Sequence, residues 1–255
     1  MSGDRQLAQQ LLDAALRLSN ARPERNVPSP SSVARCTRQN WFKAHDVPKT
    51  HEPDNGESVI AAETGRLSEQ FLIQVVEEAG LGLAIFAQDD EEGRELVEEE
   101  LATLSLKGGQ VDNIVSMNVG DGPPALVEFK RKGVFDILNL WKSGLREAIP
   151  DEFTQVQALM RAKGLARCLY VASNWDRGSL TWRTNKYDER PLGLYAEWVA
   201  YSRPTALAVK VRAEMQTRFI EGETDPARVP RDHDPFAGKF PCSWCRWMPT
   251  CKEAG

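Results

Sequence analysis

The spacing of hydrophobic positions predicts an N-terminal segment that is separate from the rest of the chain. Between residues 5 and 20 the apolar residues recur at helical spacing. The segment that follows, ARPERNVPSPSS, is rich in proline, serine and asparagine, which interrupt helices and strands. We therefore predict a helix and a linker in residues 1–28 and one domain in residues 29–255.

A long amphipathic helix is expected early in this domain, from Thr64 to Ala79. Threonine is a residue type that caps helix N-termini, and Gly80 is a residue type that ends helices. The apolar residues that would form one face of this helix are Leu67, Phe71, Leu72, Val75 and Val76.

Three segments typical of β-strands follow an acidic stretch. They are ELATLSL (100–106), VDNIVSMNV (111–119) and ALVEFKR (125–131), and the turns between them are rich in glycine. Alternating apolar positions joined by such turns are typical of antiparallel hairpins. The pattern predicts a three-stranded antiparallel meander.

The second half of the chain adds helices and a further strand. Helical patterns occupy residues 133–145, 150–163 and about 204–220. The short apolar run ARCLYVAS (166–173) is typical of a buried strand, and residues 179–184 could pair with it across the turn NWDRG. The order helix, three strands, helix, strand predicts an α+β fold.

Composition and charge restrict the classes of function. No apolar run approaches the roughly 20 residues of a membrane span, and the N-terminal sequence lacks the apolar stretch of a signal peptide, so we expect a cytoplasmic protein with no membrane partner. The net charge of −5 argues against a protein that coats nucleic acid, but it permits a local basic groove. Basic residues around the third strand and the following helices are Arg131, Lys132, Lys142, Arg146, Arg161 and Lys163.

Acidic residues lie on two neighbouring strands of the predicted meander. Asp112 is at the start of the second strand, and Glu128 lies on the third, on the same face as Lys130. Carboxylate oxygens are the ligands that Mg²⁺ or Mn²⁺ prefers, and an ion that they hold keeps water positions open for chemistry on a phosphate. The alternative is a salt bridge on the strand that has no catalytic role.

Three of the five cysteines lie near the C-terminus, in the pattern Cys242-x-x-Cys245-x(5)-Cys251. This spacing can surround one metal ion or cluster, and a fourth ligand is required. Thiolates select zinc or iron–sulfur clusters, both of which accept four cysteines, so ligand chemistry alone leaves the two open. Cys168 lies in an apolar strand and is expected to be a core residue.

The acidic motifs resemble those of the PD-(D/E)XK nuclease superfamily, in its RecB-like branch. The resemblance covers about residues 28–251 and implies a restriction-endonuclease-like core. GGQVDNI resembles the family's G-x-x-D motif and VEFK its E-x-K motif, which implies that Asp112 and Glu128 bind Mg²⁺ or Mn²⁺ and that Lys130 supports the attacking water. GRLSEQF resembles the G-x-x-x-(H/E) motif, which implies that Glu69 is a third metal ligand or a carboxylate near the metal.

A glutamine motif extends the resemblance. QVQAL (155–159) resembles the Q-x-x-x-Y motif, with Leu159 in place of the aromatic residue. The resemblance implies that Gln155 is a polar anchor of the catalytic site, and Gln157 is the alternative glutamine.

The cysteines resemble those of the CRISPR-associated and AddB-type iron–sulfur exonucleases. Those nucleases carry one cysteine before the core and C-x-x-C-x(5)-C after it, and SPSSVARC (29–36) resembles the family's entry segment. Trp244 and Trp247 would shield the cluster or stack on bases. The resemblance implies a [4Fe-4S] cluster, bound in part by the C-terminal tail, on Cys36, Cys242, Cys245 and Cys251.

Together the motifs imply a metal-dependent deoxyribonuclease, with a single-strand-preferring exonuclease as the family expectation. Its partners would be single-stranded DNA and a protein complex of recombination, repair or CRISPR adaptation. Two rival hypotheses remain. One is a non-catalytic DNA-binding subunit stabilised by an iron–sulfur cluster or zinc. The other is a nuclease whose substrate is determined by the protein complex to which it belongs.

Overall fold

The structure is a computed structural model. The predicted N-terminal helix is represented by Gln9 and Asp13, both helical, where Gln9 Nε2 donates a 2.9 Å hydrogen bond to Asp13 Oδ1. The other residues before the boundary predicted at residue 28 lie outside the described residues. The structure describes residues 9, 13, 28–50, 56–80, 83–87, 104, 106, 113–116, 124–174, 194–233 and 241–254.

A five-stranded sheet forms the centre of the molecule, and its strands are paired in the order β1-β2-β3-β4-β5. Strands β1 to β3 form an antiparallel meander, β4 is parallel to β3, and β5 is antiparallel to β4. The predicted α+β class is confirmed. The strands are β1 (Leu83–Ala87), β2 (Asn113–Ser116), β3 (Ala125–Lys132), β4 (Arg167–Asn174) and β5 (Leu194–Ala200).

The first strand of the meander lies earlier in the chain than predicted. β2 pairs with Leu83–Ala87, whereas the prediction placed this strand at residues 100–106. Of those residues the structure describes Leu104 and Leu106, which are not in a strand and are 1% and 2% exposed. The alternating leucines of this segment therefore indicate burial and not a strand, because apolar spacing alone does not distinguish a strand from a buried segment of another kind.

The partner of β4 also differs from the prediction. β4 pairs with β5, with Arg167 opposite Ala200 and Ser173 opposite Leu194. Residues 179–184, the predicted partner, lie outside the described residues. Tyr195 and Val199 of β5 point into the core, so the period-two alternation of this strand was a usable signal.

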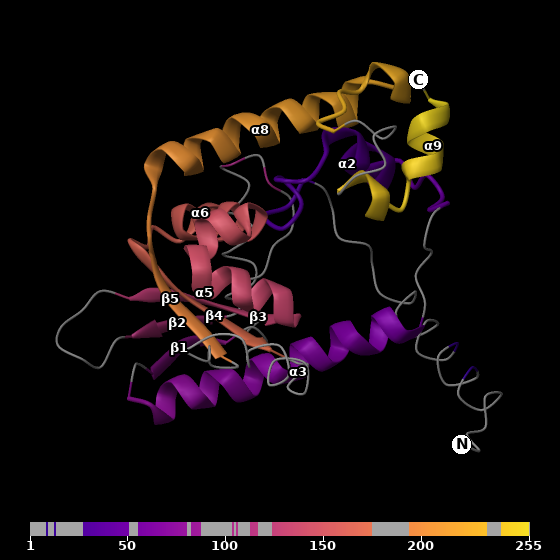
Figure 1. Ribbon diagram of the computed structural model, residues 1–255. Helices are drawn as coiled ribbons and strands as arrows, with labels where there is room; N and C mark the ends of the chain where they lie inside the picture. The colour runs from indigo at the N-terminus through magenta and orange to yellow at the C-terminus, as the bar shows by residue number, and fades with distance from the viewer. Residues whose placement is uncertain are drawn as a thin grey trace.

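Six α-helices lie among the described residues from 28 to 254, and Figure 1 shows how they are arranged relative to the sheet. α3 runs along one side of the sheet and α5 and α6 lie on the other, with α8 beyond α6 and with α2 and α9 near one end of α8. None of the described helices is long and apolar enough to cross a membrane. The helices are α2 (Thr37–Ala44), α3 (Gly56–Glu78), α5 (Val134–Ala148), α6 (Pro150–Ala162), α8 (Arg203–Gly222) and α9 (Met248–Glu253).

Helix α3 begins at Gly56, not at Thr64 as predicted. Thr64 lies inside the helix, where its Oγ1 donates a 2.7 Å hydrogen bond to the carbonyl of Ile60. A threonine hydroxyl can bond to the preceding turn as well as cap a helix, and here it does the former. The helix ends at Glu78, one residue before the predicted end at Ala79, and Gly80 adopts the left-handed φ of +67° that stops a helix.

Side chains of β3 alternate between two cores. Leu126 packs with Tyr170 of β4 in the core that α5 and α6 cover, whereas Val127 and Phe129 pack against Leu72 of α3 on the other face. Phe71 of α3 is 63% exposed, so the predicted apolar face of this helix is only partly buried. The alternation places Glu128 on the side of the sheet that faces α5 and α6.

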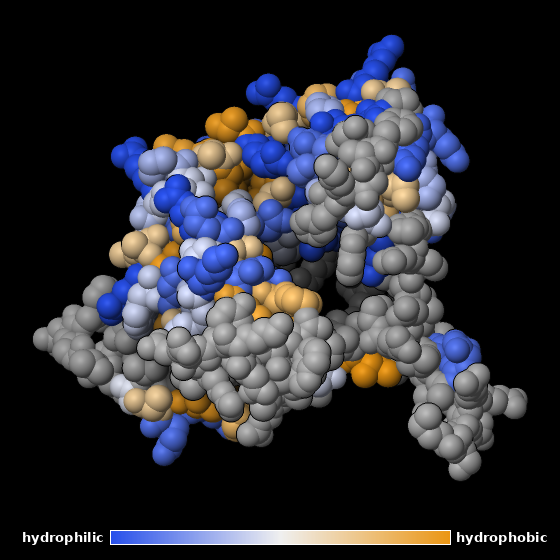
Figure 2. All heavy atoms as spheres, in the orientation of Figure 1, coloured by the Kyte–Doolittle hydropathy of each residue, from blue (hydrophilic) through white to orange (hydrophobic). Residues whose placement is uncertain are grey.

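Helix α8 has a packed side and an outer side. Ala206, Val209 and Ala213 are buried, whereas Leu207 and Val211 are exposed. On the face shown in Figure 2, hydrophobic residues over α8 lie among hydrophilic ones. Scattered apolar residues of this kind are normal on a protein surface.

Candidate functional site

The side chain of Glu128 is the centre of a buried polar group. It is 0% exposed on β3. Its Oε1 is in contact with Lys130 Nζ and accepts a 2.8 Å hydrogen bond from Gln155 Nε2 of α6. Three of the residues predicted from motifs therefore lie together, and the strand alternation and the following helix explain why.

Gln157 has a different role from Gln155. It is fully buried, donates a 3.0 Å hydrogen bond to the carbonyl of Ala200 and accepts a 2.6 Å hydrogen bond from the amide of Ser202. These contacts join α6 to the end of β5. Of the two candidate glutamines, Gln155 is the one at Glu128.

A second polar group beside Glu128 was not anticipated from the sequence. Tyr170 of β4, which is opposite Glu128 in the sheet, donates a 2.5 Å hydrogen bond to Glu152 Oε2, and Lys132 Nζ lies 2.5 Å from Glu152 Oε1. Burial, and then the charge of Glu152, raise the pKa of the Tyr170 hydroxyl above its ordinary value. The sequence does indicate Glu152 as an acid in the first turn of α6. Its partners Tyr170 and Lys132 come from two strands, so their contacts with Glu152 could not be predicted.

The other predicted metal ligands are not described in full. Asp112 lies outside the described residues, and the next residue, Asn113, pairs with Val127 beside Glu128. Glu69 is on α3, which packs on the opposite face of β3 from Glu128, and its side chain is not described.

The four predicted cysteine ligands all line one cavity of about 890 Å³. Cys36 comes from the start of α2, and the other three come from the C-terminal segment. Lys132 and Asp136 line the same cavity, so it reaches the end of β3 and the start of α5. Cys168 is instead fully buried in the core, as predicted.

Burial favours the protonated thiols of Cys245 and Cys251. Burial raises the pKa of Cys245, and Cys36 and Cys251 raise it further, while a backbone hydrogen bond lowers it. Burial also raises the pKa of Cys251, although Arg38 and Arg231 lower it. A metal must displace these protons to bind thiolates, so its affinity rises with pH.

No group of three or more His, Cys, Asp or Glu side chains in the described part of the chain is arranged to hold a metal ion as it stands. The set of four thiols around one cavity nevertheless suits a soft metal in its chemistry, since thiolates select zinc or iron–sulfur clusters. The donor set fits the predicted centre, and the cysteine side chains would have to close around it.

Trp247 belongs to the packing around the cysteines. It is 5% exposed, stacks near Phe42 with ring centroids 6.4 Å apart, and its Nε1 donates a 2.7 Å hydrogen bond to the carbonyl of Val47. A buried indole with these contacts is not available to stack on a base. The side chain of Trp244 is not described.

The basic residues predicted to line a groove have varied contacts. Lys132 lines the cavity and pairs with Glu152. Arg161 donates a 3.3 Å hydrogen bond to the hydroxyl of Tyr201, and the guanidinium of Arg146 lies 5.6 Å from the ring centroid of Phe153. Of these three cations, Lys132 is the one that faces the cavity.

Comparisons with known proteins bear on the fold alone. No family model matches the chain, and no curated protein matches it. The crystal structure of SSO0001 is similar, with a TM-score of 0.51, 13% sequence identity and coverage of 98% of each chain. The mixed α+β architecture is thus shared with a solved protein along nearly the whole chain.

Proposed function

We propose that this chain is a metal-dependent deoxyribonuclease that hydrolyses phosphodiester bonds, with single-stranded DNA as its substrate and exonucleolytic cleavage as its mode. The carrying observation is that Lys130 and Gln155 both contact Oε1 of the buried Glu128. Glu128 and Lys130 lie on β3, and Gln155 lies on α6, in the helix pair that follows this strand. This order of carboxylate, lysine and glutamine matches the order of motifs in RecB-like nucleases. The restriction-endonuclease-like core is part of the same proposal.

Each residue of the proposed catalytic site would have a distinct role. Glu128 and Asp112, with Glu69, would hold a Mg²⁺ or Mn²⁺ ion, which when bound polarises the phosphate and activates water. Gln155 fixes the orientation of the Glu128 carboxylate through its 2.8 Å hydrogen bond. Lys130 supplies an ammonium group beside that carboxylate, where it can position the attacking water or offset charge that develops on the phosphate.

The cysteine centre is the second part of the proposal. A [4Fe-4S] cluster on Cys36, Cys242, Cys245 and Cys251 would tie α2 to the C-terminal segment. Phosphodiester hydrolysis needs no redox step, so the role of the cluster is structural. Zinc is the competing occupant, and metal analysis of protein purified without oxygen decides between them.

A non-catalytic DNA-binding subunit is the second candidate, and one observation favours it. Glu128 is 0% exposed and in contact with Lys130, and a buried carboxylate requires such a partner whether or not it is catalytic. Under this hypothesis the protein binds DNA and degrades none. A protein complex of recombination, repair or CRISPR adaptation is the expected setting for either function.

Cleavage of end-labelled single-stranded DNA with and without Mn²⁺ tests the proposal. We expect Glu128→Gln to lower the rate at least about 100-fold, because several kcal/mol of transition-state stabilisation depend on the ion. DNA binding should persist, because phosphate contacts come mainly from basic groups.

Glu214→Gln is the matched control. It removes the same charge from the exposed surface of α8, where Glu214 Oε1 lies 3.9 Å from Lys210 Nζ, and it should cleave like the wild type. DNA binding without Mn²⁺-dependent cleavage in the wild type would favour the non-catalytic subunit. Full activity of Glu128→Gln would refute the site.

A further inference from the structure

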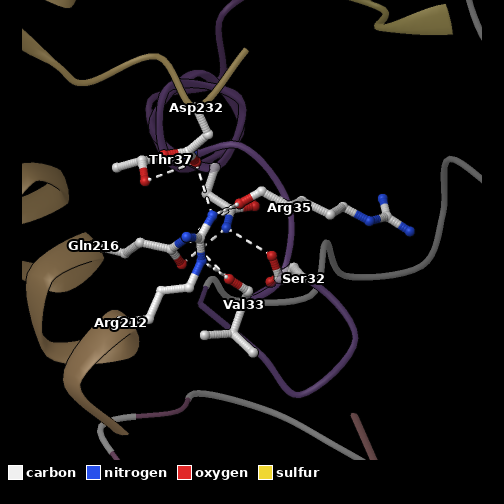
Figure 3. A network of polar contacts seen from close by, with 8 residues as sticks. Ser32, Val33, Arg35, Thr37, Arg212, Gln216 and Asp232 are labelled. Carbon is white, nitrogen blue, oxygen red and sulfur yellow. Dashed lines mark hydrogen bonds and ion pairs between the residues drawn. The ribbon is translucent and has the colours of Figure 1, made fainter. Parts of the chain in front are cut away.

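The backbone on both sides of Cys36 is held by residues from the other end of the chain. The carbonyl of Arg35 accepts hydrogen bonds from Arg212 Nη2 at 2.9 Å and from Gln216 Nε2 at 3.2 Å. The amide of Thr37 donates a 2.7 Å hydrogen bond to Asp232 Oδ2. Figure 3 shows these groups converging, with the side chain of Arg35 extending away from them.

Asp232 supplies the cap that helix α2 lacks in its own sequence. Cys36 is the N-cap residue of α2 and makes no side-chain cap hydrogen bond. Asp232 Oδ2 instead accepts from both the amide and, at 3.2 Å, the hydroxyl of Thr37. A carboxylate at a helix N-terminus is also favoured by the helix dipole, so this contact fixes where α2 begins.

Arg212 and Gln216 lie one turn apart on α8, and both donate hydrogen bonds to the backbone carbonyls of residues 33 and 35. Arg212 Nε donates to the carbonyl of Val33 at 2.6 Å, and Gln216 Nε2 donates to that carbonyl at 3.1 Å. Gln216 is 0% exposed. Arg212 Nη2 also lies 2.8 Å from Asp232 Oδ2, which joins the two halves of the network.

We propose that Arg212, Gln216 and Asp232 are positioning residues for the cysteine centre. They hold the Cys36 backbone in place before any metal binds, so that only its side chain must turn toward the three tail cysteines. This inference rests on the proposed cysteine centre. A ligand far from the others in sequence is costly to order, and residues that orient ligands typically contribute about 10- to 100-fold to metal affinity.

Two conservative variants test this role. Arg212→Lys keeps the charge but cannot reach Val33, Arg35 and Asp232 together, and Asp232→Asn keeps the shape of the cap but loses its charge. The matched control is Lys210→Met, which removes a cation from the same helix at a site outside the network.

The first measurement is the rate at which a chelator removes iron from protein reconstituted with Fe²⁺ and sulfide. We expect about tenfold faster loss from Arg212→Lys and Asp232→Asn than from the wild type. The second measurement uses the metal-free protein and follows modification of Cys36 by a thiol reagent. Both variants should react faster there than the control, because the backbone at Cys36 is released.

Circular dichroism identifies which variants are folded, and Arg212→Lys is the milder one if Asp232→Asn gives no folded protein. Folded variants with unchanged iron loss and unchanged Cys36 reactivity would overturn the positioning role. Wild-type protein that binds neither iron nor zinc would refute the cysteine centre itself. That result would overturn the positioning role as well, because the role rests on the centre, whereas wild-type protein that binds metal and variants with unchanged iron loss would overturn the positioning role alone.

Discussion

Tyr170 acts as a hydrogen-bond donor inside the core. It is 0% exposed, and its hydroxyl lies 2.5 Å from a carboxylate oxygen of Glu152. Burial and the neighbouring carboxylates Glu152, Glu128 and Asp136 all disfavour the phenolate and raise the pKa of Tyr170. The protonated tyrosine therefore orients Glu152, whose other oxygen faces Lys132 at the cavity.

This raised pKa predicts how stability depends on pH. In the unfolded chain a tyrosine loses its proton near pH ~10, whereas folded Tyr170 keeps it. The free energy of unfolding that Tyr170 contributes is therefore complete below pH ~10 and is lost as pH rises above that value. Tyr170→Phe should be about 1 kcal/mol less stable at neutral pH, because it lacks the hydrogen bond to Glu152.

Urea unfolding of both proteins at several pH values checks this expectation. The difference in the free energy of unfolding between wild type and Tyr170→Phe should shrink as pH rises above about 10. A difference that stays constant into the alkaline range would show that Tyr170 titrates equally in both states.

At the scale of elements, helix α5 changes direction at Gly144. This residue has φ of +74° and ψ of 170°, and the helix resumes at Leu145, whose amide donates a 2.8 Å hydrogen bond to Glu197 Oε2 of β5. Tyr195 donates to the same oxygen at 2.5 Å. Glu197 therefore caps the second half of α5 from a neighbouring strand.

The left-handed conformation at Gly144 predicts a specific cost. Gly144→Ala should lower the free energy of unfolding by about 1–2 kcal/mol, because a Cβ disfavours positive φ. The control is Gly222→Ala at the end of α8, where a Cβ meets open space and φ is not positive. Thermal melts of both variants measure the effect, and equal melting temperatures would contradict it.

Much of the site could be predicted because its residues are local in sequence. Glu128 and Lys130 share a strand face, and Gln155 follows in the helix pair behind that strand. The partners of α2 and of β4 could not be predicted, because contacts such as Thr37 with Asp232 join segments that no periodicity connects. The first strand of the meander was misplaced for a related reason, since leucines buried in a non-strand segment have strand-like spacing.

At the scale of the whole molecule, the C-terminal segment is attached to α2 by more than the cysteines. Trp247 Nε1 donates to the carbonyl of Val47, and the amide of Thr50 donates a 2.9 Å hydrogen bond to the carbonyl of Arg246. A metal in the cavity would add to these contacts. Its loss should therefore weaken the attachment without abolishing it.

Cys36→Ala tests this balance. We expect loss of bound metal and colour together with a lower melting temperature and lower soluble yield, because binding free energy present only in the folded state counts toward folding. Cys168→Ala is the control, because this cysteine lies in the core and should leave the iron content unchanged. A colourless Cys36→Ala protein with an unchanged melting temperature would contradict a structural cluster.

The bonds that close the network around α2 have a consequence for synthesis of the protein. Thr37 and Arg38 bond to residues 195 and 191 positions later in the chain. During translation the α2 segment leaves the ribosome long before its partners exist, and non-local contacts of this kind form late and slowly. A nascent chain that stalls before Asp232 carries an α2 segment without its cap, so we expect this segment to reach its final structure only when the last part of the chain has been made.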